Sequence, residues 1–121
     1  MQLRRISPEL AARHFVGLAK LDPRGMATDA DMLPMCQAGE CFEISTEHGR
    51  AVLVVVVRNG VHWVDAARGQ GIEDMTVAID EALRQLGARS IAFQTARLGL
   101  VRKCARLGYR VTGHVMRRDI P

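Results

Sequence analysis

The sequence lacks an apolar run long enough to cross a membrane and lacks the apolar core of a signal peptide. Its longest apolar run, Ala51 to Val57 (AVLVVVV), has seven residues, whereas a spanning helix needs about 20. Charged residues interrupt the N-terminal stretch MQLRRISPELAARHF, unlike a secretory leader. We therefore expect no membrane partner and a cytoplasmic location.

Cysteine is scarce, and neither cysteine nor histidine is spaced for a metal. Cys36, Cys41 and Cys104 are odd in number and form no C-x-x-C pair, and the four histidines do not stand at metal-ligand spacings. These spacings disfavour a disulfide framework and a structural zinc. Reduced thiols and no metal are the expectation.

Aromatic residues are also few, and acidic residues almost disappear in the C-terminal part. From Arg84 onward nine basic residues face one acid, Asp119. This asymmetry predicts an anionic partner, either a phosphorylated cofactor or nucleic acid, unless it is only a solvated basic face. One Trp, one Tyr and three Phe offer few stacking platforms, which disfavours single-stranded nucleic acid.

The N-terminal half predicts two helices followed by three strands. Ser7-Pro8-Glu9 is typical of a helix start, and a short second helix runs through Met32 to Cys36 and ends near Gly39. Apolar residues alternate or run continuously in strands at 41–46, 50–58 and 61–67. The pair Asn59-Gly60 predicts a tight hairpin between the last two strands.

The C-terminal half changes period. Apolar residues recur at three- and four-residue steps from Ile72 to Leu86, which predicts an amphipathic helix. A strand at 90–95, reached by a crossover and hence parallel to the strand before the helix, precedes a second helix from Leu98 to Gly108. A final strand is expected at 109–119. The order is α-α-β-β-β-α-β-α-β in one domain, 1–121, of class α/β (α+β) with a mixed twisted sheet.

The stretch Arg68-Gly69-Gln70-Gly71-Ile72 lies between a predicted strand and the amphipathic helix. A pyrophosphate binds where backbone N–H groups converge at a helix N-terminus, because the helix dipole favours negative charge there. Glycines allow close approach of the phosphate, and an arginine adds charge. The stretch therefore predicts a phosphate-binding turn, with a plain strand-to-helix turn as the alternative.

This stretch and the element order resemble the GNAT superfamily of acyl-CoA N-acyltransferases, whose cofactor loop reads Q/R-x-x-G-x-G/A and is often written out as R-G-x-G-I-G. Arg68, Gly71 and Ile72 match it, and Lys103 to Gly113 (KCARLGYRVTG) is similar to the family's helix ending in L-G-F or L-G-Y. The resemblance covers roughly Cys41 to Asp119. It implies the GNAT fold, acetyl-CoA or a related acyl-CoA as cosubstrate, and transfer of the acyl group to an amine.

The resemblance also implies the site residues. The cofactor would be held by the loop and by the strand that precedes it, through Val64, Arg68, Gly69, Gln70, Gly71, Ile72 and Glu73. Two of these depart from the family pattern: Glu73 replaces the last small residue of the loop, and Val64 is one residue nearer to Arg68 than usual. A carboxylate close to phosphate opposes binding unless it points away.

Two residues are candidates for proton transfer. Alignment on Leu107-Gly108-Tyr109 puts Cys104 where many family members carry a tyrosine general acid, and a thiol could protonate the leaving thiolate. His62, on the strand leading to the loop, is the candidate base because its ordinary pKa suits neutral pH. The alternatives are a buried apolar role for Cys104 and a structural or surface role for His62.

Three functions remain on these grounds. The leading one is an N-acyltransferase that uses acyl-CoA on an unidentified amine. The second is a catalytically degenerate GNAT-like binding or accessory protein, favoured by Glu73, Cys104 and the short chain. The third is a basic nucleic-acid-binding module. The sequence names neither the acceptor nor the oligomeric state, because fold alone does not fix function.

Overall fold

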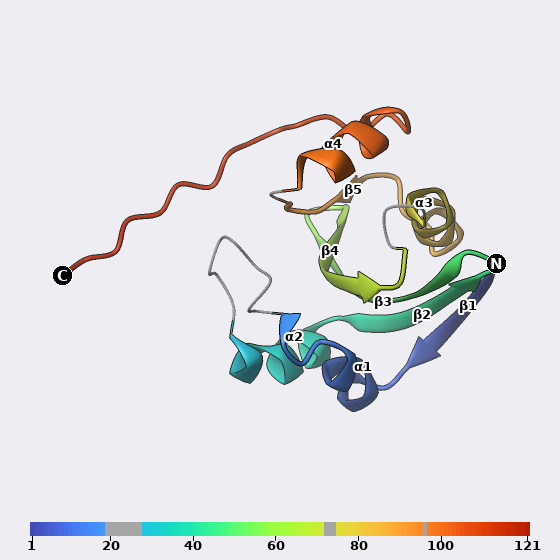
Figure 1. The fold of residues 1–121 in the computed structure, drawn as a ribbon, viewed down its shortest axis with the longest axis horizontal. Helices are drawn as coiled ribbons and strands as arrows, with labels where there is room; N and C mark the ends of the chain where they lie inside the picture. Colours follow the sequence, from blue (N-terminus) through green and yellow to red (C-terminus); the bar gives the residue numbers. More distant parts are fainter. Residues whose placement is uncertain (19–27, 72–74, 96) are drawn as a thin grey trace.

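The structure is a computed structural model, and it describes residues 1–18, 28–71, 75–95 and 97–121. Five strands form one sheet in the order β1-β2-β3-β4-β5. Neighbouring strands are antiparallel except for β4 and β5, which are parallel. Helices lie on both faces of the sheet (Figure 1). The α/β (α+β) class with a mixed sheet is confirmed.

The chain begins with a strand that the sequence analysis did not predict. β1 (Gln2–Ile6) pairs antiparallel with β2 (Glu40–Thr46) at the edge of the sheet. Its sequence, QLRRI, has no alternating apolar pattern, and Ile6 is its one buried residue. Arg4 reaches Glu43 on the neighbouring strand at 3.1 Å. The pairing depends on a strand more than thirty residues away, which local sequence cannot show.

Two helices follow and cover one face of the sheet. α1 (Pro8–His14) begins where predicted, since the Ser7 hydroxyl accepts a hydrogen bond from the Leu10 N–H at 3.1 Å. A 3-10 turn, η2 (Asp29–Asp31), leads into α2 (Met32–Ala38). Pro34 lies in the first turn of α2, where its missing N–H breaks no helical bond.

The three-stranded meander is confirmed. β2, β3 (Gly49–Arg58) and β4 (Val61–Gly69) are antiparallel neighbours. Asn59 and Gly60 have φ of +52° and +77°, as a tight hairpin turn requires.

β3 supplies both layers of the core. Its residues 51–55 are all buried, and they point alternately to the α1–α2 side and to the α3 side of the sheet. Phe15, Cys36 and Val54 lie in the first cluster, and Ile44, Leu53 and Leu83 are in the second. This two-sided burial explains the continuous apolar run of the sequence.

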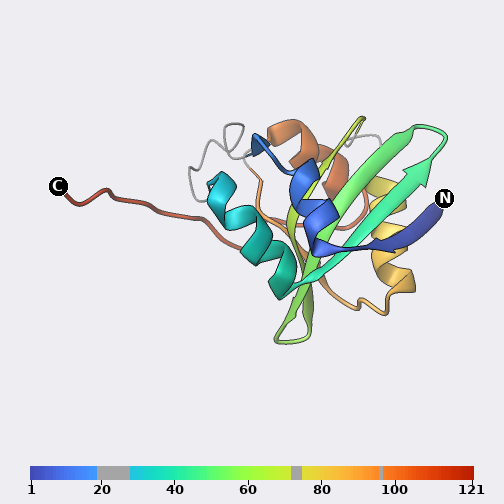
Figure 2. The same cartoon turned by 90° about the horizontal axis from the view of Figure 1, so that it is seen from below.

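The predicted helices of the C-terminal half are present, in shortened form. α3 (Thr76–Gln85) covers the other face of the sheet (Figures 1 and 2). The expected start of this helix, residues 72–74, lies outside the described residues. β5 (Ile91–Ala92) is parallel to β4, as predicted, but has only two residues. α4 (Leu98–Ala105) ends in a turn that contains Gly108, with φ of +96°. Of the described helices, none is long and apolar enough for a bilayer.

The prediction of a final strand at Tyr109–Asp119 is wrong for this structure. Residues 110–121 are exposed and belong to no helix or strand, and they project from the body in both views (Figures 1 and 2). An alternating pattern predicts a strand only if a neighbouring strand exists to pair with it. β5, the nearest edge in sequence, is regular for two residues and provides little ladder.

Candidate functional site

β4 carries a bulge in its middle. Val54 of β3 pairs with Ala66 and Val55 pairs with Val64, so Asp65 is the extra residue on β4. The bulge shifts the parity of the strand. Val64 and Ala67 therefore both pack on the α3 side, while Ala66 packs on the α1–α2 side. Bulges commonly occur next to active sites, because they redirect backbone groups out of the ladder.

The bulge residue is held by a neighbouring strand. The Asp65 carboxylate accepts two hydrogen bonds from the Arg58 guanidinium, at 2.8 and 2.6 Å. These bonds raise the pKa of Arg58 above its ordinary value. The Asp65 carboxylate therefore holds the bulge in place, and it is already paired with the Arg58 guanidinium.

Beyond the bulge, β4 and β5 part. Their ladder consists of two pairs, His62 with Ile91 and Trp63 with Ala92. From Val64 to Gly69 that edge of β4 faces no strand in the described part of the chain. Its backbone N–H and C=O groups are available to a ligand with amide groups of its own.

The turn after β4 has the geometry of a glycine-dependent connection. Gln70 donates its N–H to the Arg50 carbonyl at 3.1 Å, Gly71 has φ of +63°, and its carbonyl accepts from the Met75 N–H at 3.1 Å. Met75 is the N-cap of α3. The predicted turn between β4 and α3 therefore exists. Ile72 and Glu73, which complete the predicted cradle, lie outside the described residues.

Gly69 has a packing role that the sequence pattern does not reveal. A Cβ added at Gly69 would lie 2.0 Å from the Arg50 carbonyl oxygen and 2.7 Å from the Ala51 Cα. Only glycine allows β3 and β4 to approach this closely. The glycine is therefore explained by the sheet, with or without a phosphate.

Arg68 is directed to the opposite side of the sheet from α3. Its Nη1 donates to the Val16 carbonyl at 2.5 Å and to the His14 carbonyl at 3.4 Å. His14 is the last residue of α1, whose final C=O groups have no helical partners, and Val16 lies in the turn just after its C-cap, Phe15. Arg68 thus ties α1 to β4 and satisfies that helix end, and in this conformation it supplies no charge at the turn.

Cys104 is buried on α4, close to two polar groups. The side chain is 5% exposed. Burial raises the pKa of the Cys104 thiol, and the negative charge of Asp80 raises it further. Tyr109 donates its hydroxyl to Asp80 Oδ1 at 2.9 Å, and its ring contacts Phe93 with centroids 5.7 Å apart. Burial and the hydrogen bond to Asp80 also raise the Tyr109 pKa.

Asp80 is the site residue that the sequence analysis missed. It lies on α3, beside the apolar seam, and its partner is 29 residues away. No local pattern marks such a carboxylate, since charged residues on an amphipathic helix usually face solvent. Its contact with Tyr109 joins α3 to the segment that follows α4.

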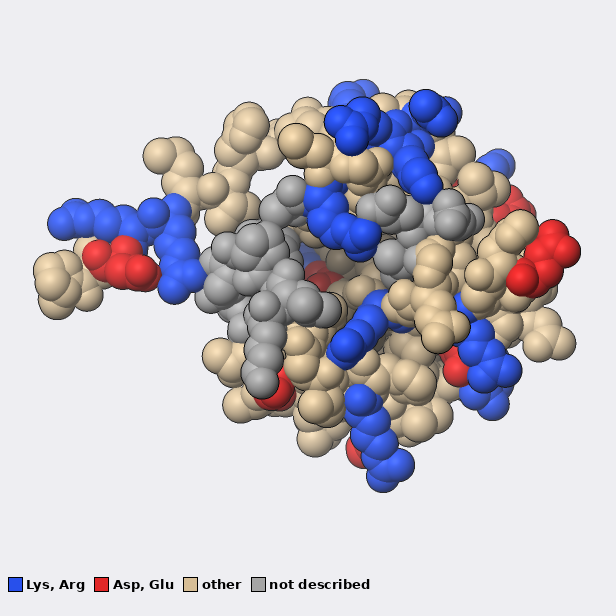
Figure 3. All heavy atoms as spheres, viewed as in Figure 1, with Lys and Arg blue, Asp and Glu red and all other residues tan. Residues whose placement is uncertain are grey.

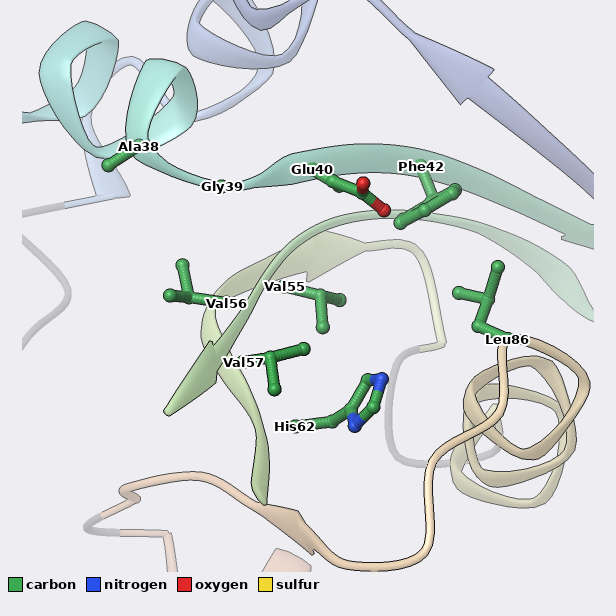
Figure 4. A pocket seen from close by; sticks show the side chains of 9 residues that line it. All are labelled: Ala38, Gly39, Glu40, Phe42, Val55, Val56, Val57, His62 and Leu86. Atoms are coloured by element: carbon green, nitrogen blue, oxygen red, sulfur yellow. The ribbon is translucent and has the colours of Figure 1, made fainter. Parts of the chain in front are cut away.

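His62 lies at the opposite end of β4 from the glycine turn. It lines an open cavity of about 500 Å³ between the end of β3 and the end of α3, together with Phe42, Val57 and Leu86 (Figure 4). His62 Nδ1 is shielded from solvent and has no hydrogen-bond partner within the part of the chain that the structure describes. A catalytic histidine is normally oriented by a bond to its second nitrogen. Because His62 lies at the other end of β4, the structure does not bring it together with the glycine turn.

Comparisons with known proteins point to one fold. Neither a family model nor a curated protein matches the chain. A GCN5-related N-acetyltransferase from Ralstonia eutropha superposes with a TM-score of 0.59 at 13% identity, covering 98% of this chain and 97% of that one. An aminoglycoside N-acetyltransferase in complex with CoA gives 0.53 at 16% identity, with 99% of both chains covered. A ribosomal-protein-alanine N-acetyltransferase from Brucella melitensis gives 0.51 at 11% identity, covering 98% and 100%. The chain has the GNAT fold.

Proposed function

We propose that this protein binds an acyl-CoA, acetyl-CoA in the first instance, and transfers the acyl group to an amine. One combined observation carries the proposal. The bulge at Asp65, the unpaired edge of β4 beyond it and the Gly71 turn into α3 follow one another along a single strand. The free backbone groups of β4 therefore lie next to the start of a helix. This arrangement suits a long ligand whose amides would bond the strand and whose diphosphate would lie at the helix start.

The residues present suit acyl-CoA in part. The turn at Gly69, Gln70 and Gly71, with Ile72 and Glu73 after it, would hold the diphosphate through backbone N–H groups. The free edge of β4 near Val64 would bond the amides of the pantetheine arm. Arg68 is occupied by α1, so positive charge for the phosphates would come from elsewhere.

Exposed cations of α4 are one candidate source of that charge. Arg102 lies on α4, Arg106 is its C-cap, and both are exposed. Basic side chains lie over the α4 region in Figure 3. Their fields reach about 10 Å at ordinary ionic strength. They are the candidates for contact with the 3′-phosphate of CoA.

The reaction requires one bond to form and one to break. The amine nitrogen attacks the thioester carbonyl carbon, the carbon–sulfur bond breaks, the thiolate takes a proton and the amine loses one. Cys104 is the proposed proton donor to the thiolate, because a thiol is protonated at neutral pH; its raised pKa makes it a weaker acid than an exposed thiol. His62 is proposed as the base, either on the amine or through a water.

A catalytically inert GNAT-fold protein is the second candidate, and specific observations favour it. Arg68 is turned to α1, Cys104 is buried, and His62 lies at the far end of β4. The direction of Arg68 weakens phosphate binding, and the positions of Cys104 and His62 weaken proton transfer, without affecting the fold. Binding of acetyl-CoA without release of free thiol, in the presence of a panel of primary amines, would establish this second function.

Calorimetric titration with acetyl-CoA tests the proposed site. Gly71 and Gly60 bound β4 at its two ends, and both have positive φ, so alanine strains the backbone at either position by about 1–2 kcal/mol. Gly71→Ala should weaken binding at least tenfold, about 1.4 kcal/mol, while Gly60→Ala should leave it unchanged. No binding by the wild type, or equal losses in both variants, would remove the turn as the site.

Glu73 provides a second test in the same titration. If its carboxylate points away from the phosphates, Glu73→Gly should change affinity little. If it opposes them, the substitution should raise affinity tenfold or more, about 1.4 kcal/mol.

The basic C-terminal part is tested with dephospho-CoA. Loss of affinity relative to CoA would assign arginines such as Arg102 and Arg106 to the 3′-phosphate, and equal affinity would withdraw that role. RNA serves as the comparison ligand. Steep salt dependence of RNA binding, with no binding of CoA, would instead support the nucleic-acid-binding function.

A further inference from the structure

An open cavity lies at the hairpin end of the sheet, away from the glycine turn. It has a volume of about 500 Å³ and is bounded by β2, β3, β4 and the residue that ends α3 (Figure 4). This volume falls within the range of about 300–1,000 Å³ that is common for small-molecule pockets. From His62 to Gly69, β4 spans about 20 Å at the usual rise of a strand. The cavity is therefore separate from the proposed diphosphate site.

The cavity exists because β3 continues past the start of β2. The pairing of β2 with β3 ends at Glu40 and Val55, and Val57 lies two residues further along β3. Val57 is 58% exposed, and Leu86, the C-cap of α3, is 36% exposed. Both side chains line the cavity together with the buried ring of Phe42 (Figure 4). These walls would gain free energy by contact with an apolar body.

His62 brings a hydrogen-bonding group into this apolar hollow. It pairs with Val57 across the two strands, and its imidazole ring points into the cavity (Figure 4). Its Nδ1 is shielded from solvent and has no hydrogen-bond partner among the described residues. A neutral imidazole carries its proton on one nitrogen, and a buried N–H without a partner is rarer than an unsatisfied acceptor. We therefore assign the proton to Nε2, which can donate one hydrogen bond to a ligand.

The charges around the cavity favour a neutral ligand over an anion. Glu40 lies at its rim and forms an ion pair with Arg5 at 2.5 Å, so these two charges offset each other. The C-terminal end of α3 adds partial negative charge. Arg84, the cation in the last turn of that helix, is paired with Glu81 at 3.7 Å. A carboxylate in the cavity would therefore be repelled, whereas an uncharged oxygen could accept from His62.

We propose that this cavity binds a small neutral molecule that has an aromatic or branched aliphatic body and one carbonyl oxygen. The body packs against Phe42, Val57 and Leu86, and the oxygen accepts a hydrogen bond from His62 Nε2. The proposal does not rest on acyl-CoA binding. It makes His62 a hydrogen-bond donor, which prevents its use as a base while the cavity is occupied.

Titration of isotope-labelled protein with acetophenone, without acyl-CoA, tests the proposal. We expect saturable amide shifts at Val57, His62 and Leu86 in the low millimolar range, and none at Gly71. Benzoate, an anion of similar size, should bind at least tenfold more weakly. Shifts that do not saturate, shifts confined to other parts of the chain, or equal affinity for benzoate would overturn the proposal.

A pair of matched variants tests the hydrogen bond. His62→Phe keeps a ring of similar size and removes the donor, so it should raise the dissociation constant of acetophenone at least tenfold. Binding of toluene, which has no oxygen, should not be weakened by this change. His48→Phe alters a side chain that is 66% exposed on the turn between β2 and β3 and should change neither constant. Equal acetophenone affinity in the wild type and in His62→Phe would overturn the proposal.

The ring nitrogens of His62 give a readout in the wild type that needs no variant. The ¹⁵N resonance of Nε2 should show a directly bonded proton and should move as acetophenone is added, while that of Nδ1 moves less. A proton on Nδ1 instead, or an Nε2 resonance that does not respond to a ligand bound in the cavity, would contradict the assigned donor.

Discussion

The two halves of the sheet differ in how completely they are packed. β1, β2 and β3 with α1 and α2 contain most of the buried apolar side chains, whereas the described residues after the hairpin at Asn59-Gly60 contain four. Every residue of β4 from 61 to 68 is only partly buried, β5 has two paired residues, and residues 110–121 are exposed. The first half is a closed platform. In the second half, the edge of β4 from Val64 to Gly69 faces no strand among the described residues, which suits the proposed binding of a ligand there.

Truncation in the closed half should give the largest effect. Leu53 is 1% exposed and central to the cluster under α3. Leu53→Ala should lower the free energy of unfolding by about 2–5 kcal/mol through lost burial and a residual cavity. Val111→Ala in the open half should change it by less than about 0.5 kcal/mol. Chemical denaturation measures both, and similar losses would contradict the division.

Gly69, where the two halves meet, should respond next most strongly. Gly69→Ala forces a Cβ against the Arg50 carbonyl oxygen, which should cost about 1–3 kcal/mol as β3 and β4 are pushed apart. Gly113→Ala, with nothing within 4 Å of its Cβ, is the matched control. If the Gly69 variant is as stable as the wild type, the close strand contact is not the reason for this glycine.

Tyr109 tests how the open half is held together. Tyr109→Phe removes the hydrogen bond to Asp80 and keeps the ring against Phe93. The expected loss in the free energy of unfolding is about 1.5 kcal/mol, typical of a bond to a charged group. In an Asp80→Ala background, where this bond is already absent, the same substitution should cost almost nothing. A double-mutant cycle measures the coupling energy between Tyr109 and Asp80. Zero coupling would show that their hydrogen bond does not stabilise the contact between α3 and the segment after α4.

The smallest expected effect is a pH dependence in the closed half. Burial raises the pKa of Cys36 to about 12, while an unfolded thiol ionises near ~8.5. The unfolded state therefore loses its proton first as pH rises, so stability present below about pH 8.5 decreases up to the folded pKa. Relative to Cys36→Ala, the wild type should lose about 1.4 kcal/mol between pH 7 and pH 9.5. A difference independent of pH, as expected for Val57→Ala, would contradict the assignment.

The sequence predicted the elements whose signals are local. The Ser7 cap, the buried run of β3, the Asn59-Gly60 hairpin and the glycine turn at Gly71 each follow from residues within a few positions of one another. The general GNAT fold followed from their order together with the resemblance.

The rest depends on contacts between distant residues. β1 is a strand only because β2 lies beside it, and the expected final strand has no ladder in the single chain. Arg68 matched a cofactor motif, yet its partners are carbonyls 52 and 54 residues away. Asp80 carries no local sign of its contact with Tyr109. The motif predicted where the turn lies, but the direction of the Arg68 side chain depends on how α1 packs against β4.

The central claim is that acyl-CoA binds along the open edge of β4 and at the turn into α3. Titration of isotope-labelled protein with acetyl-CoA, followed by backbone amide chemical shifts, tests it most directly. The claim predicts the largest shifts at Gly69, Gln70 and Gly71 and at the start of α3, with smaller ones along β4 from Val64 and none at Gly60. No shifts at millimolar acetyl-CoA, or shifts confined to the cavity around His62, would contradict it.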